Sequence, residues 1–350
     1  MKWIIPIGLL LICSSVNAQR RPGDWPVGGM VWFDPDIISQ TIQETTISFL
    51  GEGEIPWRLG YFCIANSQDD PLVNKYRVQF DGEKEIILAF KLDDLSIDEQ
   101  QMSAELIAAS LAQLPREIVD IAPDVIAVKS GDGFASANPN YGSMCVQMSK
   151  TLRGDTAAAF VQSEHRPYAE FLAETMLHEI SHAGGLDNEL NGNLYRAGND
   201  RFATDGIGNF SEWTKGWSEL QLAYETARIC DDSTVSYYAW QNPFSEDVAE
   251  SLAVWVYLTY FNDELSQEWR EYFYDKASNR LNVFDHYFLG KPLNPWIERG
   301  VSDTKYDAFT GEVVVSQLEI DGSRYDVRME VYDLESNLLR VNSLNPSCGP

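Results

Sequence analysis

Alternating and continuous apolar runs in the first part of the chain predict short β-strands. Residues 76–80 (Tyr-Arg-Val-Gln-Phe) and 85–90 (Glu-Ile-Ile-Leu-Ala-Phe) flank the dipeptide Asp81-Gly82. That dipeptide between two such runs is typical of a β-hairpin. Two further apolar runs predict strands at 125–128 and 145–148, with a loop from Gly131 to Gly142 between them.

Helical periodicity dominates the middle of the chain. An apolar period near 3.6 over residues 97–114 predicts a helix that ends before Pro115. A second helix is predicted from Pro167, which suits a first helical turn, to Gly184-Gly185, which suits a C-terminal cap. The same periodicity predicts further helices at 216–229, 245–261 and 265–278.

The last part of the chain returns to a strand pattern. Residues 312–315 and 324–331 surround Asp321-Gly322, which predicts another hairpin. The order of the elements, with strands at both ends and helices between them, favours the α+β class.

The second helix carries the most specific motif of the chain, His178-Glu179-Ile180-Ser181-His182. Histidines at i and i+4 lie on one helical face, so both imidazoles can bind one zinc ion, and Glu179 is then placed to take a proton from the attacking water. Because the chain has only four histidines, a chance occurrence has a probability of about 0.003, which makes two unrelated histidines a poor explanation. A separate apolar stripe on the same helix can face the core: Leu172, Met176, Ile180 and Ala183.

A catalytic zinc site needs a third protein ligand and one open position. Asp187 follows the glycine turn and is one candidate. The longer motif His-Glu-x-x-His-x-x-Gly-x-x-His would place a third histidine at position 188, but that residue is Asn188. His165 and His286 are remote candidates. The best candidate is Glu246, on the helix predicted at 245–261.

Glu246 and Glu250 are four residues apart, so both face one side of that helix. One carboxylate can bind the ion, and the other can fix the tautomer of a ligand histidine. Asp247 faces another side, where the helix dipole favours a first-turn acid. The alternative is that all three form a solvated acidic face, and Ser245 or Asn242 can cap the helix in either case.

The histidine motif, followed by Ser245-Glu246-Asp247-Val248-Ala249-Glu250 on a later helix, resembles the zincin superfamily. It is most similar to the anthrax lethal factor-like peptidases, whose later helix carries Glu-x-x-Ala-Glu. The resemblance covers roughly residues 100–260. It implies that Glu246 binds zinc and that Glu250 contacts the ligands without binding the ion. It also implies that Tyr238 or Tyr237 lies near the substrate oxyanion. The lethal factor spacing itself falls on Ala239.

The same resemblance implies a zincin-like fold, with the active-site helix under a small mixed sheet and a helical C-terminal subdomain. It also implies a strand edge above the helix that binds the substrate backbone by β-addition. The segment 145–148 is the candidate for that edge.

Net charge, the N-terminal residues and the cysteines indicate the partners and the environment of the chain. A formal net charge of −27 argues against nucleic acid and anionic membranes as partners, because their phosphates would be repelled. Residues 1–18 have the pattern of an export signal with cleavage near Ala18. Four cysteines follow the signal, and in an exported chain they predict two disulfides with three possible pairings: Cys63, Cys145, Cys230 and Cys348.

We therefore expect a signal peptide at 1–18, a β-rich region at 19–95, a metallopeptidase domain at 96–304 and a β appendage at 305–350. The expected protein is a secreted Zn²⁺-dependent endopeptidase with a protein or peptide substrate. A non-peptidase zinc amide hydrolase and a catalytically silent zinc-binding protein remain as alternatives. If residues 19–95 are a propeptide, a Cys63 thiolate can instead cap the metal.

Overall fold

The structure is a computed structural model of the chain. It describes residues 43–61, 63–65, 67–81, 84–131, 135–138, 141–148, 168–190, 207–208, 218–231, 234–236, 238–239, 246–262, 265–298, 313–321, 324–332 and 338–343. The predicted signal at 1–18 lies outside these residues. The described residues form a mixed α/β structure, consistent with the predicted α+β class.

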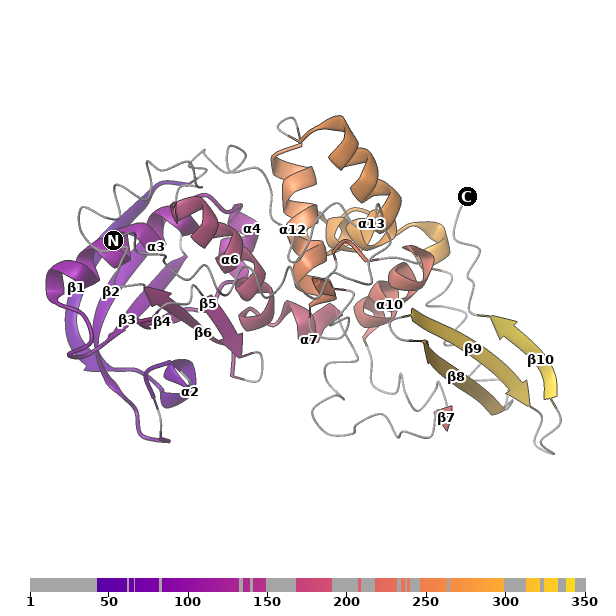
Figure 1. Cartoon of the computed structure of the whole chain (residues 1–350), viewed down its shortest axis with the longest axis horizontal. Helices are drawn as coiled ribbons and strands as arrows, with labels where there is room; N and C mark the ends of the chain where they lie inside the picture. Colours follow the sequence, from indigo (N-terminus) through magenta and orange to yellow (C-terminus); the bar gives the residue numbers. More distant parts are fainter. Residues whose placement is uncertain are drawn as a thin grey trace, which may run out of the picture.

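A six-stranded mixed sheet forms one end of the molecule (Figure 1), in the order β1-β2-β3-β4-β6-β5. Its strands are β1 (Thr45–Glu54), β2 (Leu72–Phe80), β3 (Glu85–Lys91), β4 (Val125–Ser130), β5 (Ala135–Asn138) and β6 (Ser143–Met148). β4 pairs in parallel with β3 and β6, and the other pairs are antiparallel. The predicted hairpin is therefore β2–β3. The predicted boundary after residue 95 falls directly after β3, and the sheet continues across it.

Helices pack on both faces of this sheet. One face carries α3 (Ile97–Leu111), whose N-terminus is closed by a capping box between Ser96 and Glu99, and α4 (Arg116–Ile121). The same core contains α6 (Tyr168–Ala183), which contacts α3 and β5. The other face is covered by α2 (Trp57–Gly60), which contacts β4 and β6.

The remaining helices form a second layer beside α6 (Figure 1). They are α7 (Leu186–Leu190), α10 (Glu219–Asp231), α12 (Asp247–Tyr260) and α13 (Gln267–Leu289). Every residue of α12 from Asp247 to Leu258 is buried, because the helix is enclosed by α6, α7 and α13. α13 extends eleven residues beyond the end of the helix predicted at 265–278. It ends at Gly290, where a positive φ of 64° provides the stop signal.

A second sheet lies at the far end of the molecule from β1–β3 (Figure 1), in the order β10-β9-β8-β7. β8 (Val313–Asp321) and β9 (Arg324–Tyr332) are the predicted C-terminal hairpin. β10 (Leu338–Ser343) and the short β7 (Ile207–Gly208) extend it on either side, so the appendage is larger than a hairpin.

The edge of the six-stranded sheet differs from the prediction. β6 contains the segment 145–148 but lies between β4 and β5, so it is an inner strand. The edge is β5, which falls within the predicted loop from Gly131 to Gly142. Its sequence Ala-Ser-Ala-Asn lacks the branched and aromatic residues that mark a strand, and pairing with β6 imposes the extended form.

Candidate metal centre

Two histidines of α6 converge from consecutive helical turns. Nε2 of His178 and Nε2 of His182 lie 3.2 Å apart, and both side chains are buried. The helix can hold them there because its predicted apolar stripe occupies the core on another side. The spacing in sequence therefore produces a pair of imidazoles that share one point in space.

A carboxylate from α12 completes the group. Glu246 is the residue before the first turn of α12, and its Oε2 lies 3.0 Å from Nε2 of His178 and 3.3 Å from Nε2 of His182. The three side chains are near enough to bind one metal ion. The structure thus brings together the three residues predicted as ligands. The predicted caps Ser245 and Asn242 lie outside the described residues.

Two further carboxylates contact the opposite nitrogens of the histidine rings. Oε1 of Glu250 lies 3.0 Å from Nδ1 of His178 and forms an ion pair with the protonated ring. Oδ2 of Asp187 contacts Nδ1 of His182 at very short range, and its Oδ1 accepts a hydrogen bond from Ser181. Each carboxylate can orient the ring it touches and leave Nε2 available to a metal.

The charges of the site shift the pKa values of its groups. Burial opposes protonation of His178, but the carboxylates of Glu246 and Glu250 outweigh it and raise its pKa to about 9. Burial is likewise outweighed at His182, where Asp187 holds the pKa well above 6.5. The pKa of Glu246 is lowered despite its burial, because both histidines favour its carboxylate form. The metal-free site therefore holds protons that a metal ion must displace.

Glu179 lies next to the converging group and beneath the sheet edge. Burial raises the pKa of its carboxyl, although the two histidines and a hydrogen bond from the backbone N–H of Ala137 lower it in part. Ala137 belongs to β5, so the free edge of that strand faces Glu179. A raised pKa suits a group that accepts and returns a proton near neutral pH.

Tyr238 is the tyrosine found at the site. Its ring centroid lies 6.1 Å from that of His178, and its hydroxyl is hydrogen-bonded to Glu246. Burial, and then the charge of Glu246, raise the pKa of Tyr238, so the hydroxyl keeps its proton at neutral pH. Tyr237 lies outside the described residues, and Ala239, which the lethal factor spacing marks, is buried.

Comparison of the chain with protein-family models, with curated proteins and with solved structures finds no match. The site must therefore be interpreted from its own geometry. Within the described residues, no helix is long and apolar enough to cross a membrane.

The cysteines resolve one of the predicted alternatives. Cys63 and Cys145 form a disulfide that ties the end of α2 to β6, with their Cα atoms 5.5 Å apart. This excludes Cys63 as a thiolate cap on the metal. Cys230 is also disulfide-bonded, while Cys348 lies outside the described residues. Disulfides of this kind indicate an oxidising environment.

Sequence reasoning missed two features of the site. Asp187 was a candidate ligand, but it contacts the far nitrogen of His182 and does not join the three converging donors. The Gly184-Gly185 turn directly before it was the available signal, because it returns the chain toward α6. Asp247 is the first-turn acid that was expected, but its complete burial among charged partners was missed. His286 lies elsewhere on α13 and contacts the carbonyl of Lys291, and His165 is not described.

Proposed function

We propose that the chain is an exported zinc-dependent endopeptidase of the zincin type, most similar to the lethal factor-like peptidases. One observation carries the proposal. The Glu179 carboxylate lies within electrostatic range of His178, His182 and Glu246, and it also contacts the free edge of β5. A metal site that serves only the fold has no use for an acid–base group beside it.

The donor set suits zinc. Two imidazole nitrogens and one carboxylate oxygen are a common ligand set of catalytic zinc, which leaves one position open. In a tetrahedral site with zinc–ligand bonds of 2.0–2.1 Å, neighbouring donors lie about 3.3 Å apart. The donor separations of 3.2, 3.0 and 3.3 Å are close to that value. The group therefore needs little rearrangement to hold the ion.

The chemistry divides among a few side chains. Zinc bound at this position would lower the pKa of a water molecule and polarise the scissile carbonyl. Glu179 accepts the proton of the attacking water and passes it to the leaving amine. The protonated hydroxyl of Tyr238 is placed to donate to the developing oxyanion. Glu250 and Asp187 keep the two imidazoles in the orientation that binding requires.

The sheet edge supports a peptide as substrate. Among the described residues, β5 pairs with β6 on one side and with no strand on the other. An extended peptide can add to that edge through its backbone, which brings a scissile bond beside Glu179. An oxidising environment, indicated by the disulfides, agrees with the export signal expected at 1–18.

The test measures zinc content and peptide cleavage for three proteins. Glu179→Gln removes the proposed base, and Glu189→Gln is the matched control, because this exposed acid of α7 accepts a hydrogen bond from Tyr287 on α13 and does not belong to the group of converging donors. We expect all three proteins to hold one zinc per chain. A peptide-library digest should show cleavage by the parent and by Glu189→Gln, and at least a hundredfold loss for Glu179→Gln, as expected for a general base.

The other outcomes separate the alternatives. A parent chain without zinc rejects the proposal outright. Zinc with hydrolysis of small amides but of no peptide identifies a non-peptidase amide hydrolase. Zinc with no hydrolysis identifies a silent zinc-binding protein.

A further inference from the structure

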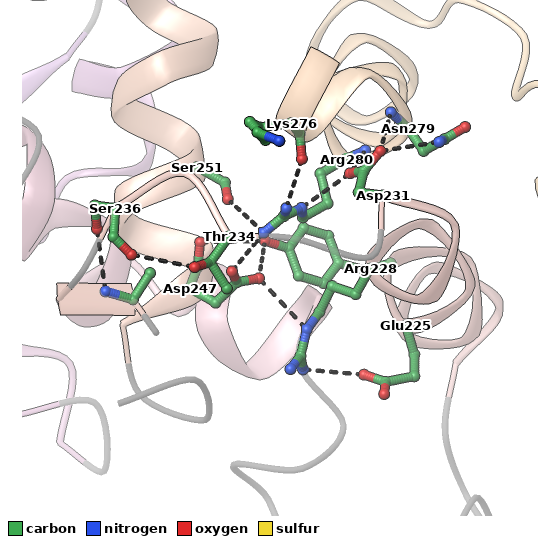
Figure 2. Close-up of polar contacts among 12 residues, drawn as sticks. Glu225, Arg228, Asp231, Thr234, Ser236, Asp247, Ser251, Lys276, Asn279 and Arg280 are labelled. Atoms are coloured by element: carbon green, nitrogen blue, oxygen red, sulfur yellow. Dashed lines mark hydrogen bonds and ion pairs between the residues drawn. The ribbon is translucent and has the colours of Figure 1, made fainter. Parts of the chain in front are cut away.

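A cluster of buried charges joins α10, α12 and α13 next in sequence to the candidate ligand Glu246, and Figure 2 shows its polar contacts. Its centre is Asp247, the residue that follows Glu246 in the chain, and its side chain is fully buried. None of its members belongs to the group of converging donors. The members are Tyr224, Glu225, Arg228, Asp231, Asp247, Ser251 and Arg280.

Asp247 is held from three directions. Its Oδ1 accepts a hydrogen bond of 2.5 Å from Nη1 of Arg280 on α13. Its Oδ2 accepts a hydrogen bond of 3.0 Å from the hydroxyl of Tyr224 and lies 3.5 Å from Nε of Arg228, both on α10. The first turn of α12 is therefore fixed to two other helices through one side chain.

Arg280 is held equally firmly. Its side chain is wholly buried, and its Nε donates to Oδ2 of Asp231 at 3.0 Å while Nη2 donates to the carbonyl of Lys276 at 3.0 Å. Asp231 also accepts from the backbone N–H groups of Asn279 and Arg280. The guanidinium that reaches Asp247 thus cannot swing away without breaking several bonds at once (Figure 2).

Such a cluster is a poor means of stabilising a fold. Burying charges costs desolvation energy, and well-packed apolar residues of similar volume give equal or greater stability. What an ion-pair cluster provides is a defined geometry, because the guanidinium accepts partners only along fixed directions. A defined geometry matters most where a neighbouring side chain must hold a fixed position.

Glu246 is the neighbouring side chain that needs a fixed position, because it is the candidate third ligand. It precedes α12 as the N-cap residue, yet its side chain makes no capping bond, because the carboxylate is directed to the two histidines. Among the described residues, no side chain caps the first turn of α12 in the way that ordinarily fixes such a terminus. Asp247 is the adjacent residue, and its bonds to Tyr224 and Arg280 hold the start of the helix that carries the ligand.

We propose that Asp247 and Arg280 are positioning residues that set the carboxylate of Glu246 at the metal and so raise the affinity of the site for zinc. The inference rests on the proposed function, in that His178, His182 and Glu246 bind the ion. It assigns to α13, which contributes no ligand, control over the third ligand of the site.

The contrasting explanation is that the cluster only joins α12 to α13. The same two helices share another polar link farther along, where Nε1 of Trp255 donates to Oδ1 of Asp285 at 3.0 Å. Trp255 is two turns beyond Asp247 and is equally buried. Trp255→Phe is therefore a matched control, because it removes a partly buried hydrogen bond between the same helices without touching the first turn.

The experiment measures zinc affinity by competition with a chelator in the full chain. The proteins are the parent, Asp247→Asn, Arg280→Lys and Trp255→Phe, with thermal unfolding of each zinc-free protein recorded alongside. Asp247→Asn keeps the volume and an acceptor for Tyr224, and Arg280→Lys keeps the charge. We expect both to bind zinc about 10–100-fold more weakly, the range found when groups that orient metal ligands are altered. Trp255→Phe should lower the unfolding temperature but change zinc affinity less than threefold.

A second measurement detects the geometry itself. Cobalt(II) in place of zinc gives visible absorption that depends on the coordination of the ion, so a displaced Glu246 changes the spectrum. We expect the spectrum of Asp247→Asn to differ from that of the parent, and the spectrum of Trp255→Phe to match it.

The inference fails if both cluster variants fold and bind zinc within threefold of the parent. It also fails if neither shows a cooperative unfolding transition, because the cluster is then required for folding as a whole. A parent chain that binds no zinc rejects the proposed function and this inference together, whereas tight binding by the parent and unaltered variants rejects the inference alone.

Discussion

The affinity of the site for zinc should keep rising with pH up to about pH 9. The observation behind this prediction is the raised pKa of His178, about 9 in place of 6.5. Protonation of this ring stabilises the metal-free fold fully below pH 6.5, and that contribution is lost as the pH rises to about 9. A shift of this size corresponds to about 3 kcal/mol for a buried group.

Zinc requires the neutral ring, so it must displace the proton from His178 at any pH below about 9. Each pH unit well below pH 9 then changes the affinity about tenfold, and the change between pH 7 and pH 9 is about 50-fold from His178 alone, because half of the rings are already neutral at pH 9. The raised pKa of His182 adds to the same trend. A histidine with an ordinary pKa would give a change of less than about 1.5-fold over that interval.

The assay is a zinc titration in chelator-buffered solutions from pH 6.5 to 9, with calorimetry in two buffers to count the protons released. Glu250→Gln removes a negative charge 3.0 Å from Nδ1 of His178, so its curve should level off at lower pH. Glu189→Gln is the control and should follow the parent. An affinity that stops rising above pH 7, or a Glu250→Gln curve that matches the parent, would refute the reasoning.

Three further predictions concern single features. Glu246→Ala should lose most of its zinc, whereas Asp187→Ala should bind it about 10–100-fold more weakly, since only Glu246 supplies a donor atom; full retention by Glu246→Ala with loss by Asp187→Ala in metal analysis would reverse the two roles. Tyr238→Phe should keep its zinc and lower kcat about 100-fold with little change in KM, measured on a cleaved peptide, and an unchanged kcat would remove Tyr238 from the oxyanion site. Replacing both Cys63 and Cys145 by Ala opens a loop of 82 residues and should reduce the free energy of unfolding by about 4 kcal/mol in denaturant titrations, with a reduction below about 1 kcal/mol contradicting the estimate.

The sequence was sufficient for those parts of the site that depend on helical spacing. His178 and His182 had to share a face of α6, and Glu246 and Glu250 had to share a face of α12, because i and i+4 positions always do. Spacing within each helix does not show that the two helices meet, and the resemblance to zincins supplied that step. The hairpins β2–β3 and β8–β9 were found because Asp-Gly marks a tight turn.

The remaining features depend on contacts that spacing does not encode. Arg280 is 33 residues from Asp247, and nothing in either segment indicates that they meet. The strand β5 has almost no apolar pattern, so its extended form comes from pairing with β6 and not from its own residues. The disulfide pairing could not be chosen among three possibilities, since cysteine positions carry no information on their partners.

The disulfide between Cys63 and Cys145 links the redox state of the chain to the strands beside Glu179. Cys145 stands opposite Ser136 in the register of β6 and β5, next to the residue whose N–H reaches Glu179. The crosslink therefore restrains β6, the strand that pairs with β5 beside Glu179, and a pair of free thiols does not impose that restraint. A newly made chain gains this restraint only after an oxidant has joined two cysteines 82 residues apart. The redox state of the surroundings therefore decides whether the strands beside Glu179 carry this restraint.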